Sequence, residues 1–197
     1  MTKTIHKKFM TTYKTLRVLG VDPGTATTGW AVIEEKAGCL RSIAYGYINT
    51  PKKDSESKRL LEIITDLEKI IRKYKPREAA IEKIFFFKNQ KTVIPVSQSR
   101  GAIILTLERK NVKVFGYTPL QVKQALTGYG RAEKKQIQLM AKNILGLKSI
   151  PKPDDTADAI AIAICHLNSR KLNKFCKKGA YSHEIVIYLS ETDFSIL

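Results

Sequence analysis

The spacing of apolar residues changes near residue 55, and this change limits the folds available to the chain. Before it, apolar and β-branched runs separated by turn residues predict three strands, the last two forming a hairpin: Leu16–Val21, Gly29–Glu35 and Cys39–Asn49. After it, apolar side chains recur every three or four residues from Leu60 to Tyr74. This period predicts a long amphipathic helix, capped by Asp54 or Ser55, that ends before Pro76.

The rest of the chain alternates between short strands and helices. The elements expected, in chain order, are strand Ala79–Ile84, a helix from about Pro95 to Lys110, strand Val112–Phe115, a helix capped by Thr118 and opened by Pro119, and helices at Ala132–Leu145 and Asp155–Arg170. This order predicts an α/β fold. Its mixed sheet would have three antiparallel strands followed by parallel crossovers, with helices on its faces.

The length of 197 residues fits one domain with tails. We expect a basic arm at residues 1–15, one folded domain at 16–170 and a tail at 171–197, where the composition changes. No apolar run is long enough for a membrane span. The three cysteines have neither the spacing of a disulfide framework nor that of a zinc site, which predicts a reducing compartment such as the cytoplasm.

The charge of the chain predicts a polyanionic partner. It has 35 Lys and Arg against 18 Asp and Glu, a net charge of +17 and a pI near 9.8. Between Arg109 and Pro153, ten basic residues accompany a single acid, Glu133. With no membrane-spanning run, nucleic acid is the expected partner.

Because acids are scarce, the places where they occur are informative. Asp22 and Glu82 each end a predicted strand, while Asp155 and Asp158 share one face at the start of a predicted helix. Carboxylates brought together repel one another unless a cation offsets their charge. Mg²⁺ prefers oxygen ligands, and two such ions can stabilise both the attacking and the leaving oxygen in phosphodiester hydrolysis.

Each acid also has an ordinary structural interpretation. Asp22 precedes Pro-Gly and could serve only the turn, and Asp154 or Asp155 could be only a helix cap. Glu82 at a strand end could simply be solvated. Their joint occurrence at two strand ends and a helix start favours a shared site.

Four ordered segments resemble the RuvC family of Holliday-junction resolvases. They are Val18-Leu19-Gly20-Val21-Asp22-Pro23-Gly24 with Thr28-Gly29-Trp30, Ala80-Ile81-Glu82-Lys83-Ile84-Phe85 with Lys88-Asn89, Gln121-Val122-Lys123-Gln124 with Gly128-Tyr129-Gly130-Arg131-Ala132-Glu133-Lys134, and Asp155-Thr156-Ala157-Asp158-Ala159. The resemblance extends from about Leu16 to Leu167. It departs from the family at the long arm before Leu16 and at the tail from Arg170, which match no family motif.

The resemblance implies a ribonuclease H-like fold and a metal-dependent homodimer that cuts four-way DNA junctions by paired symmetric nicks in recombination and repair. By motif, it makes Asp22, Glu82, Asp155 and Asp158 the ligands of Mg²⁺, for which Mn²⁺ can substitute, with two ions expected per site. It also makes Lys134 a catalytic residue, and it names the RuvA–RuvB branch-migration complex as a partner. Asp155 is preferred to Asp154 because the family has an acid or histidine, two residues, and then Asp-Ala.

The resemblance and the charge pattern together give the expected DNA contacts. The residues are Phe85, Lys88, Lys91, Arg100, Lys123, Arg131 and Lys134. The lysines near the cut either stabilise charge in the transition state or only position the backbone. Phe85 either stacks on a base of the opened junction or packs into the core.

Two questions stay open in the sequence. The helix around Ser97–Leu107, with Gly101-Ala102 for close approach and Ile103, Ile104 and Leu107 to bury, is either a dimer interface or an ordinary core helix. The alternative functions are a ribonuclease H-like nuclease for RNA or other branched DNA, and a junction-binding protein without catalysis. An actin-like ATPase, whose opening strand is similar, is not expected, because that fold needs a second, related half and 197 residues leave no room for it.

Overall fold

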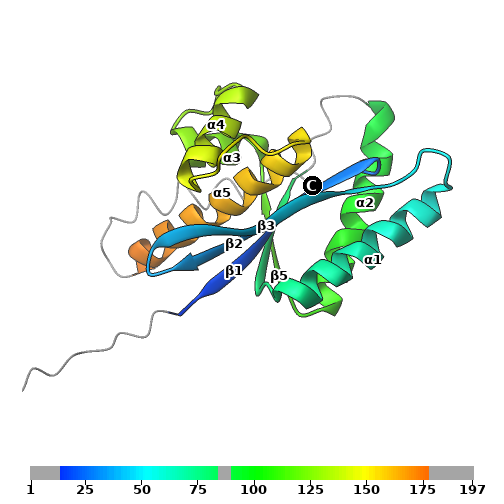
Figure 1. The fold of residues 1–197 in the computed structure, drawn as a ribbon, viewed down its shortest axis with the longest axis horizontal. Coiled ribbons are helices and arrows are strands. Elements are labelled where there is room, and N and C mark those ends of the chain that lie inside the picture. The colour runs from blue at the N-terminus through cyan, green and yellow to red at the C-terminus, as the bar shows by residue number, and fades with distance from the viewer. Residues whose placement is uncertain (1–13, 84–89, 178–197) are drawn as a thin grey trace, which may run out of the picture.

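The computed structural model describes residues 14–83 and 90–177, and in this part of the chain ten elements follow one another in the predicted order (Figure 1). They are β1 (Leu16–Asp22), β2 (Thr27–Lys36), β3 (Cys39–Asn49), α1 (Glu56–Tyr74), β4 (Glu78–Glu82), α2 (Gln90–Arg109), β5 (Lys113–Tyr117), α3 (Pro119–Thr127), α4 (Lys134–Ile144) and α5 (Asp154–Lys177). The predicted cap of α3 is confirmed, because the Thr118 hydroxyl accepts a hydrogen bond from the Gln121 backbone N–H.

The strands form one mixed sheet in the order β3-β2-β1-β4-β5. β1, β2 and β3 pair antiparallel, whereas β4 pairs parallel with both β1 and β5. This is the predicted arrangement of three antiparallel strands followed by parallel crossovers. The parallel pairs place the carboxyl ends of β1 and β4 side by side at one edge of the sheet.

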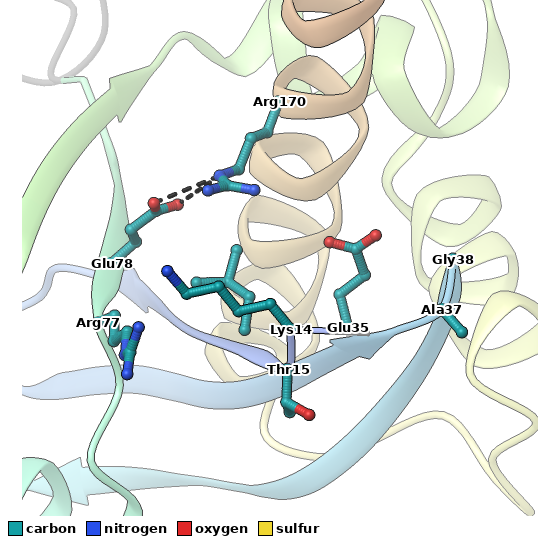
Figure 2. A pocket seen from close by; sticks show the side chains of 9 residues that line it. Lys14, Thr15, Glu35, Ala37, Gly38, Arg77, Glu78 and Arg170 are labelled. Atoms are coloured by element: carbon teal, nitrogen blue, oxygen red, sulfur yellow. Dashed lines mark hydrogen bonds and ion pairs between the residues drawn. The ribbon is translucent and has the colours of Figure 1, made fainter. Parts of the chain in front are cut away.

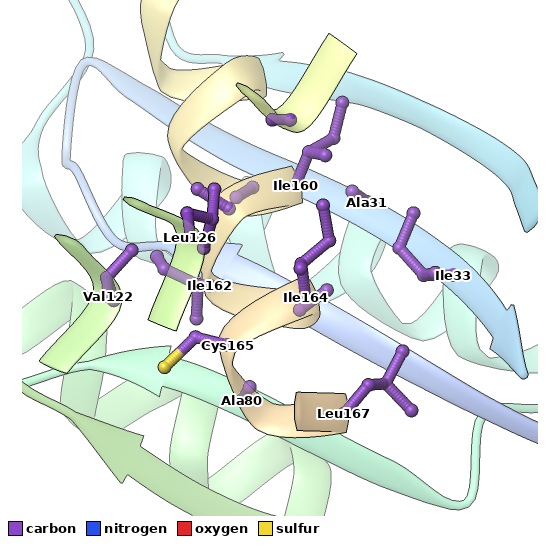
Figure 3. Close-up of a cluster of buried hydrophobic side chains, with 14 of the residues drawn as sticks. Ala31, Ile33, Ala80, Val122, Leu126, Ile160, Ile162, Ile164, Cys165 and Leu167 are labelled. Carbon is purple, nitrogen blue, oxygen red and sulfur yellow. The ribbon is translucent and has the colours of Figure 1, made fainter. Parts of the chain in front are cut away.

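Helices cover both faces of the sheet, so successive strand residues enter two different cores. Leu19, Val21 and Ile81 pack with α1 and α2, while Val18 and Ala80 pack with α3, α4 and α5 (Figure 3). The two faces are therefore both apolar, which explains the nearly continuous hydrophobic runs of β1 and β4.

Helix α5 runs across the centre of its face of the sheet, and the segment Ala159–Ile164 is buried on all sides. The sheet admits it closely at two glycines. A Cβ on Gly20 would collide with the Ala159 carbonyl oxygen, and a Cβ on Gly29 with the Asp155 carbonyl oxygen. Glycine at these two positions therefore determines how near the start of α5 lies to the ends of β1 and β2.

Replacing Gly20 with alanine tests this contact. The added methyl group has no room against α5, so Gly20→Ala is expected to lower the free energy of unfolding by about 1–3 kcal/mol, measured by chemical denaturation. Gly101→Ala is the matched control, because a Cβ there meets nothing within 4 Å. The control is expected to be at least as stable as the native protein, since alanine favours a helix. A Gly20→Ala protein as stable as the native one would mean that α5 is free to move away from the sheet.

Several element boundaries differ from the prediction. Helix α5 begins at Asp154 and continues to Lys177, past the expected end at Arg170, since no proline or glycine interrupts it. Helix α2 begins at Gln90 and contains Pro95, which is therefore not its start. Strand β4 spans Glu78–Glu82 instead of Ala79–Ile84. Among the described residues, no helix combines the length and apolarity that crossing a bilayer requires.

Candidate active site

The pleat of the sheet directs two strand-end carboxylates toward helix α5. Gly20 of β1 faces α5, so Asp22, two residues farther along the same strand, lies on the same face. Ala80 packs in the α5 core, so Glu82 shares its face of β4. Val21 pairs with Ile81 in the parallel ladder, which brings the next residues, Asp22 and Glu82, together.

The first turns of α5 bring two more carboxylates to this place. Asp155 lies where α5 contacts Gly29 of β2, and Asp158 lies one turn farther along the helix. The negative charges of Glu82, Asp158 and Asp155 all act on Asp22. The structure therefore brings together four acids from three segments that are far apart in the sequence.

Burial and mutual repulsion raise the pKa of three carboxyl groups of the cluster, those of Asp22, Glu82 and Asp158. Burial, and then the charges of Glu82, Asp158 and Asp155, raise the pKa of Asp22 well above its usual range. Burial and the charge of Asp158 raise the pKa of Glu82, and a hydrogen bond from Asp22 partly offsets this rise. Burial also raises the pKa of Asp158, although Lys134 opposes it. The cluster holds more negative charge than its surroundings stabilise.

Lys134, the first residue of α4, supplies positive charge at the edge of the cluster. Its Nζ lies 2.9 Å from Asp158 Oδ2 and 3.4 Å from Asp154 Oδ2. Burial lowers the pKa of Lys134, but these two ion pairs outweigh that effect and raise it overall. The ammonium group therefore stays charged beside the carboxylates.

Asp154 is placed differently from Asp155, although the two are neighbours in sequence. The Asp154 side chain is 64% exposed, and it accepts a hydrogen bond from Gln138 Nε2 at 3.2 Å. This bond and the charge of Lys134 lower the pKa of Asp154. Asp154 thus lies on the outer side of Lys134, while the charge of Asp155 acts on buried Asp22.

Two cavities adjoin the cluster. One, of about 190 Å³, is lined by Glu82 and Asp158 together with Lys123 and Lys134. The other, of about 390 Å³, brings Asp155 to the β1–β2 loop and to Arg59 of α1. An anionic substrate would therefore meet both carboxylates and cations at each opening.

The donor set fits a hard divalent cation, because carboxylate oxygens are the ligands that Mg²⁺ prefers and a cation would relieve the repulsion described above. As the side chains stand, however, no three acidic, histidine or cysteine residues in the described ranges are arranged as ligands of a single ion. Lys134 lies against Asp158 instead.

The other predicted contact residues are distributed around this edge of the sheet. Lys123 lines the smaller cavity and Arg131 is exposed in the turn before α4. Arg100 reaches from α2 to the backbone of Glu82. Phe85 and Lys88 lie outside the described residues, as does the side chain of Lys91, whose backbone belongs to the first turn of α2.

A larger cavity, of about 420 Å³, lies at the opposite end of the sheet, beside the starts of β1 and β4 (Figure 2). Glu78 and Arg170 form an ion pair at its wall, with Nε and Oε2 3.0 Å apart. Buried His166, to which the sequence assigned no role, connects Glu78 with the Tyr117 hydroxyl through 2.8 Å contacts on its two ring nitrogens. None of the four clustered carboxylates lines this cavity.

The ribonuclease H-like sheet, with an acidic cluster at the ends of β1 and β4 and at the start of α5, defines a class of metal-dependent nucleases. A family model described as crossover junction endodeoxyribonuclease RuvC matches residues 18–166. The chain therefore belongs to the RuvC family.

Individual relatives agree with this assignment. The crossover junction endodeoxyribonuclease RuvC of Syntrophomonas wolfei is 52% identical over 165 residues, which cover 84% of this chain and 96% of the relative. That of Halothermothrix orenii is 55% identical over 157 residues, or 80% and 95% of the two chains. A Thermus thermophilus RuvC, solved in complex with a Holliday junction substrate, superposes with a TM-score of 0.76 at 32% identity, covering 80% and 96% of the two chains.

Proposed function

We propose that this protein is a structure-specific endonuclease that resolves four-way DNA junctions by paired symmetric nicks, in homologous recombination and DNA repair. The observation that carries the proposal is the gathering of Asp22, Glu82, Asp155 and Asp158 beside the cavity that holds Lys123 and Lys134. In metal-dependent phosphodiester hydrolysis, carboxylates bind the metal ions and lysines neutralise the phosphates of the DNA. This site has both groups. The family assignment does not favour an RNA-directed nuclease or a junction-binding protein without catalysis.

We propose Mg²⁺ as the metal, with Mn²⁺ able to substitute, and two ions per site. The four clustered carboxylates would hold them, with Asp22 under the charges of the other three. When bound, the metal supplies stabilisation of the attacking and leaving oxygens. Lys134 would turn from Asp158 toward the scissile phosphate and stabilise charge that develops there.

The basic residues around the site would hold the DNA backbone. Lys123 and Arg131 lie on α3 and on the turn before α4, so they would contact phosphates on one side of the cut. Contacts by Phe85, Lys88 and Lys91 remain predictions for residues or side chains outside the described part of the chain. Binding is expected to weaken steeply as salt is added.

Helix α2 offers the surface for the proposed homodimer. Ile103 and Leu107 are buried in the core of the chain itself, so they do not form the interface that the sequence allowed for them. The outer face of α2 instead exposes Ile94 and Leu105, with open space over Gly101. A two-fold dimer through this face would give one acidic site for each of two symmetric nicks.

A charge on this outer face is expected to separate the dimer. Sedimentation equilibrium should give the mass of two chains for the native protein and one chain for Leu105→Glu, because the substitution buries an unpaired carboxylate in the interface. Leu61→Glu on α1 is the matched control, since Leu61 is 62% exposed and Leu105 60%. A native protein with the mass of one chain and full activity would contradict the dimer.

The proposed activity is tested by comparing substrates. A labelled four-way junction, a linear duplex of the same sequence and an RNA–DNA hybrid are incubated with the protein in Mg²⁺, in Mn²⁺ and in EDTA. Cutting of the junction in either metal, with little cutting of the duplex or hybrid, is expected. Preference for the hybrid, or junction binding without cutting, would move the function to one of the two alternatives. We also propose that the protein acts in the cytoplasm, together with the RuvA–RuvB branch-migration complex.

A further inference from the structure

Two neighbouring residues of α2 contact the end of β4 at Glu82 and the loop that follows Asp22. Arg100 donates a hydrogen bond from Nε to the carbonyl oxygen of Glu82, 3.1 Å away. The Ser99 hydroxyl lies 3.1 Å from Thr25 Oγ1, in the loop that follows Asp22. One turn of α2 thus contacts both halves of the site from the far side of the sheet.

The contact at Ser99 belongs to a buried network around the β1–β2 loop. Ser99, Thr25 and Thr50 are 0%, 8% and 3% exposed. The Thr50 hydroxyl donates to the Thr25 carbonyl oxygen at 2.6 Å, and Arg59 Nε donates to the Thr50 hydroxyl oxygen at 2.8 Å. The single Ser99 proton serves either Thr25 Oγ1 or the Pro95 carbonyl oxygen, also 3.1 Å away. Because these groups are shielded from water, breaking one contact leaves a polar group without a partner.

The contact at Arg100 differs from that of a residue that binds DNA phosphates. Its Nε donates to a backbone carbonyl, and partial burial lowers its pKa. A planar donor with a fixed direction restricts where the Glu82 carbonyl can lie, and therefore where the Glu82 side chain begins. The Glu82 carbonyl is at the last residue of β4, where the strand ladder ends.

We infer that Ser99 and Arg100 are positioning residues: Ser99 holds the loop that follows Asp22, Arg100 holds the backbone of Glu82, and both contacts prepare these two carboxylates to bind metal. This inference rests on the proposed metal site, and it assigns Arg100 a role other than the DNA contact predicted from sequence. Residues that orient metal ligands typically change metal affinity or activity by about 10–100-fold when they are replaced.

The experiment measures metal binding without DNA, through the rise in melting temperature as Mg²⁺ is added to full-length Ser99→Ala, Arg100→Gln and Arg100→Lys. The rise in melting temperature follows the logarithm of the ratio of Mg²⁺ concentration to dissociation constant. The Mg²⁺ concentration needed for a given rise is therefore expected to increase by about 10-fold or more in each variant. Junction affinity in EDTA should stay within about twofold of the native value, because no phosphate contact is lost. Ser97→Ala and Arg109→Gln on exposed positions of α2 are the controls and should change neither quantity.

Three results would overturn the inference. A purely structural role would lower the melting temperature in EDTA without changing the Mg²⁺ concentration needed for a given rise in melting temperature. A phosphate contact by Arg100 would weaken junction binding in Arg100→Gln, reduce its salt dependence, and be restored by Arg100→Lys. Variants identical to the native protein would show that the contacts do not matter. A failure of the proposed function can be told apart from a failure of this inference. In that case the native protein itself would show no rise in melting temperature with Mg²⁺ and no cleavage of the junction.

Discussion

Asp22→Asn is expected to abolish junction cleavage and, at the same time, to stabilise the metal-free protein at neutral pH. Cleavage should fall by roughly a thousandfold, the scale for removing a central electrostatic group from an active site. Stability should rise because at neutral pH the Asp22 carboxyl must either take up a proton on folding or stay charged beside three other carboxylates, and the amide of Asn does neither. The amide can still donate a hydrogen bond to Glu82, so the folded site keeps that contact.

The same substitution should change how stability depends on pH. The pKa of Asp22 is raised in the folded chain, so between its ordinary value and the raised one the folded state binds more protons than the unfolded state. The free energy of unfolding of the metal-free protein therefore falls as the pH rises through this window. Asp22→Asn should reduce that fall, although the raised pKa values of Glu82 and Asp158 still contribute to it.

Thermal melts in EDTA and in Mg²⁺, over a range of pH, check both statements. The native protein should gain stability from Mg²⁺ and the variant should gain much less, because only the native site binds the metal well. A variant that is less stable than the native protein in EDTA, or that cuts junctions at the native rate, would contradict this account of Asp22.

Asp155→Asn is expected to abolish cleavage, whereas Asp154→Asn should leave it within a few-fold of the native rate. The charge of Asp155 acts on both Asp22 and Asp158, whereas that of Asp154 acts on Asp158, and Asp154 is exposed and pairs with Lys134 at the surface. Loss of an exposed ion pair costs only about 0–1 kcal/mol. Because the two residues are adjacent and the substitutions identical, each variant is the control for the other.

Single-turnover cleavage of a labelled junction, at saturating protein, measures the two rates independently of binding. Thermal melts confirm that both variants are folded. An inactive Asp154→Asn protein beside an active Asp155→Asn protein would reverse the assignment of the third ligand.

The fold was accessible from the sequence because its signals are local. Each signal is contained in a short stretch of sequence. Apolar residues recur with a period of two in the first 50 residues and with a period near 3.6 in α1, and a threonine followed by proline marks the start of α3. The predicted start of α2 and the predicted end of α5 were wrong because they too were judged from local signals. Pro95 resembles a helix start, although it lies inside α2, and the basic segment after Arg170 resembles a tail, although it continues α5.

The acidic cluster was predicted from spacing and family resemblance, but its physical cause is tertiary. Gly20 and Gly29 determine how closely α5 approaches, and the strand pleat directs Asp22 and Glu82 to the same face. The direction of the pleat could have been read from the sequence. The approach of a helix about 130 residues away could not, because glycine has many other uses.

The network of Thr25, Thr50 and Ser99 was missed because short polar residues carry no periodic signal. Ser99 lies between Gln98 and Arg100, and its neighbours make it look like part of a solvated helix face. Arg59, which lines the cavity beside Asp155, looks like one of many surface cations in a chain with 35 Lys and Arg. Only the packing of α1 and α2 against the β1–β2 loop gives these residues a role.

The central claim is that the gathered carboxylates cut four-way junctions in symmetric pairs. The most direct test incubates the native protein with a mobile junction, labelled in turn on each of its four strands, and maps the cuts with and without Mg²⁺. We predict nicks in two strands of like polarity, at symmetry-related positions, that require the metal. Unpaired cuts at flaps or single-strand ends, or binding without any cut in Mg²⁺ or Mn²⁺, would contradict it.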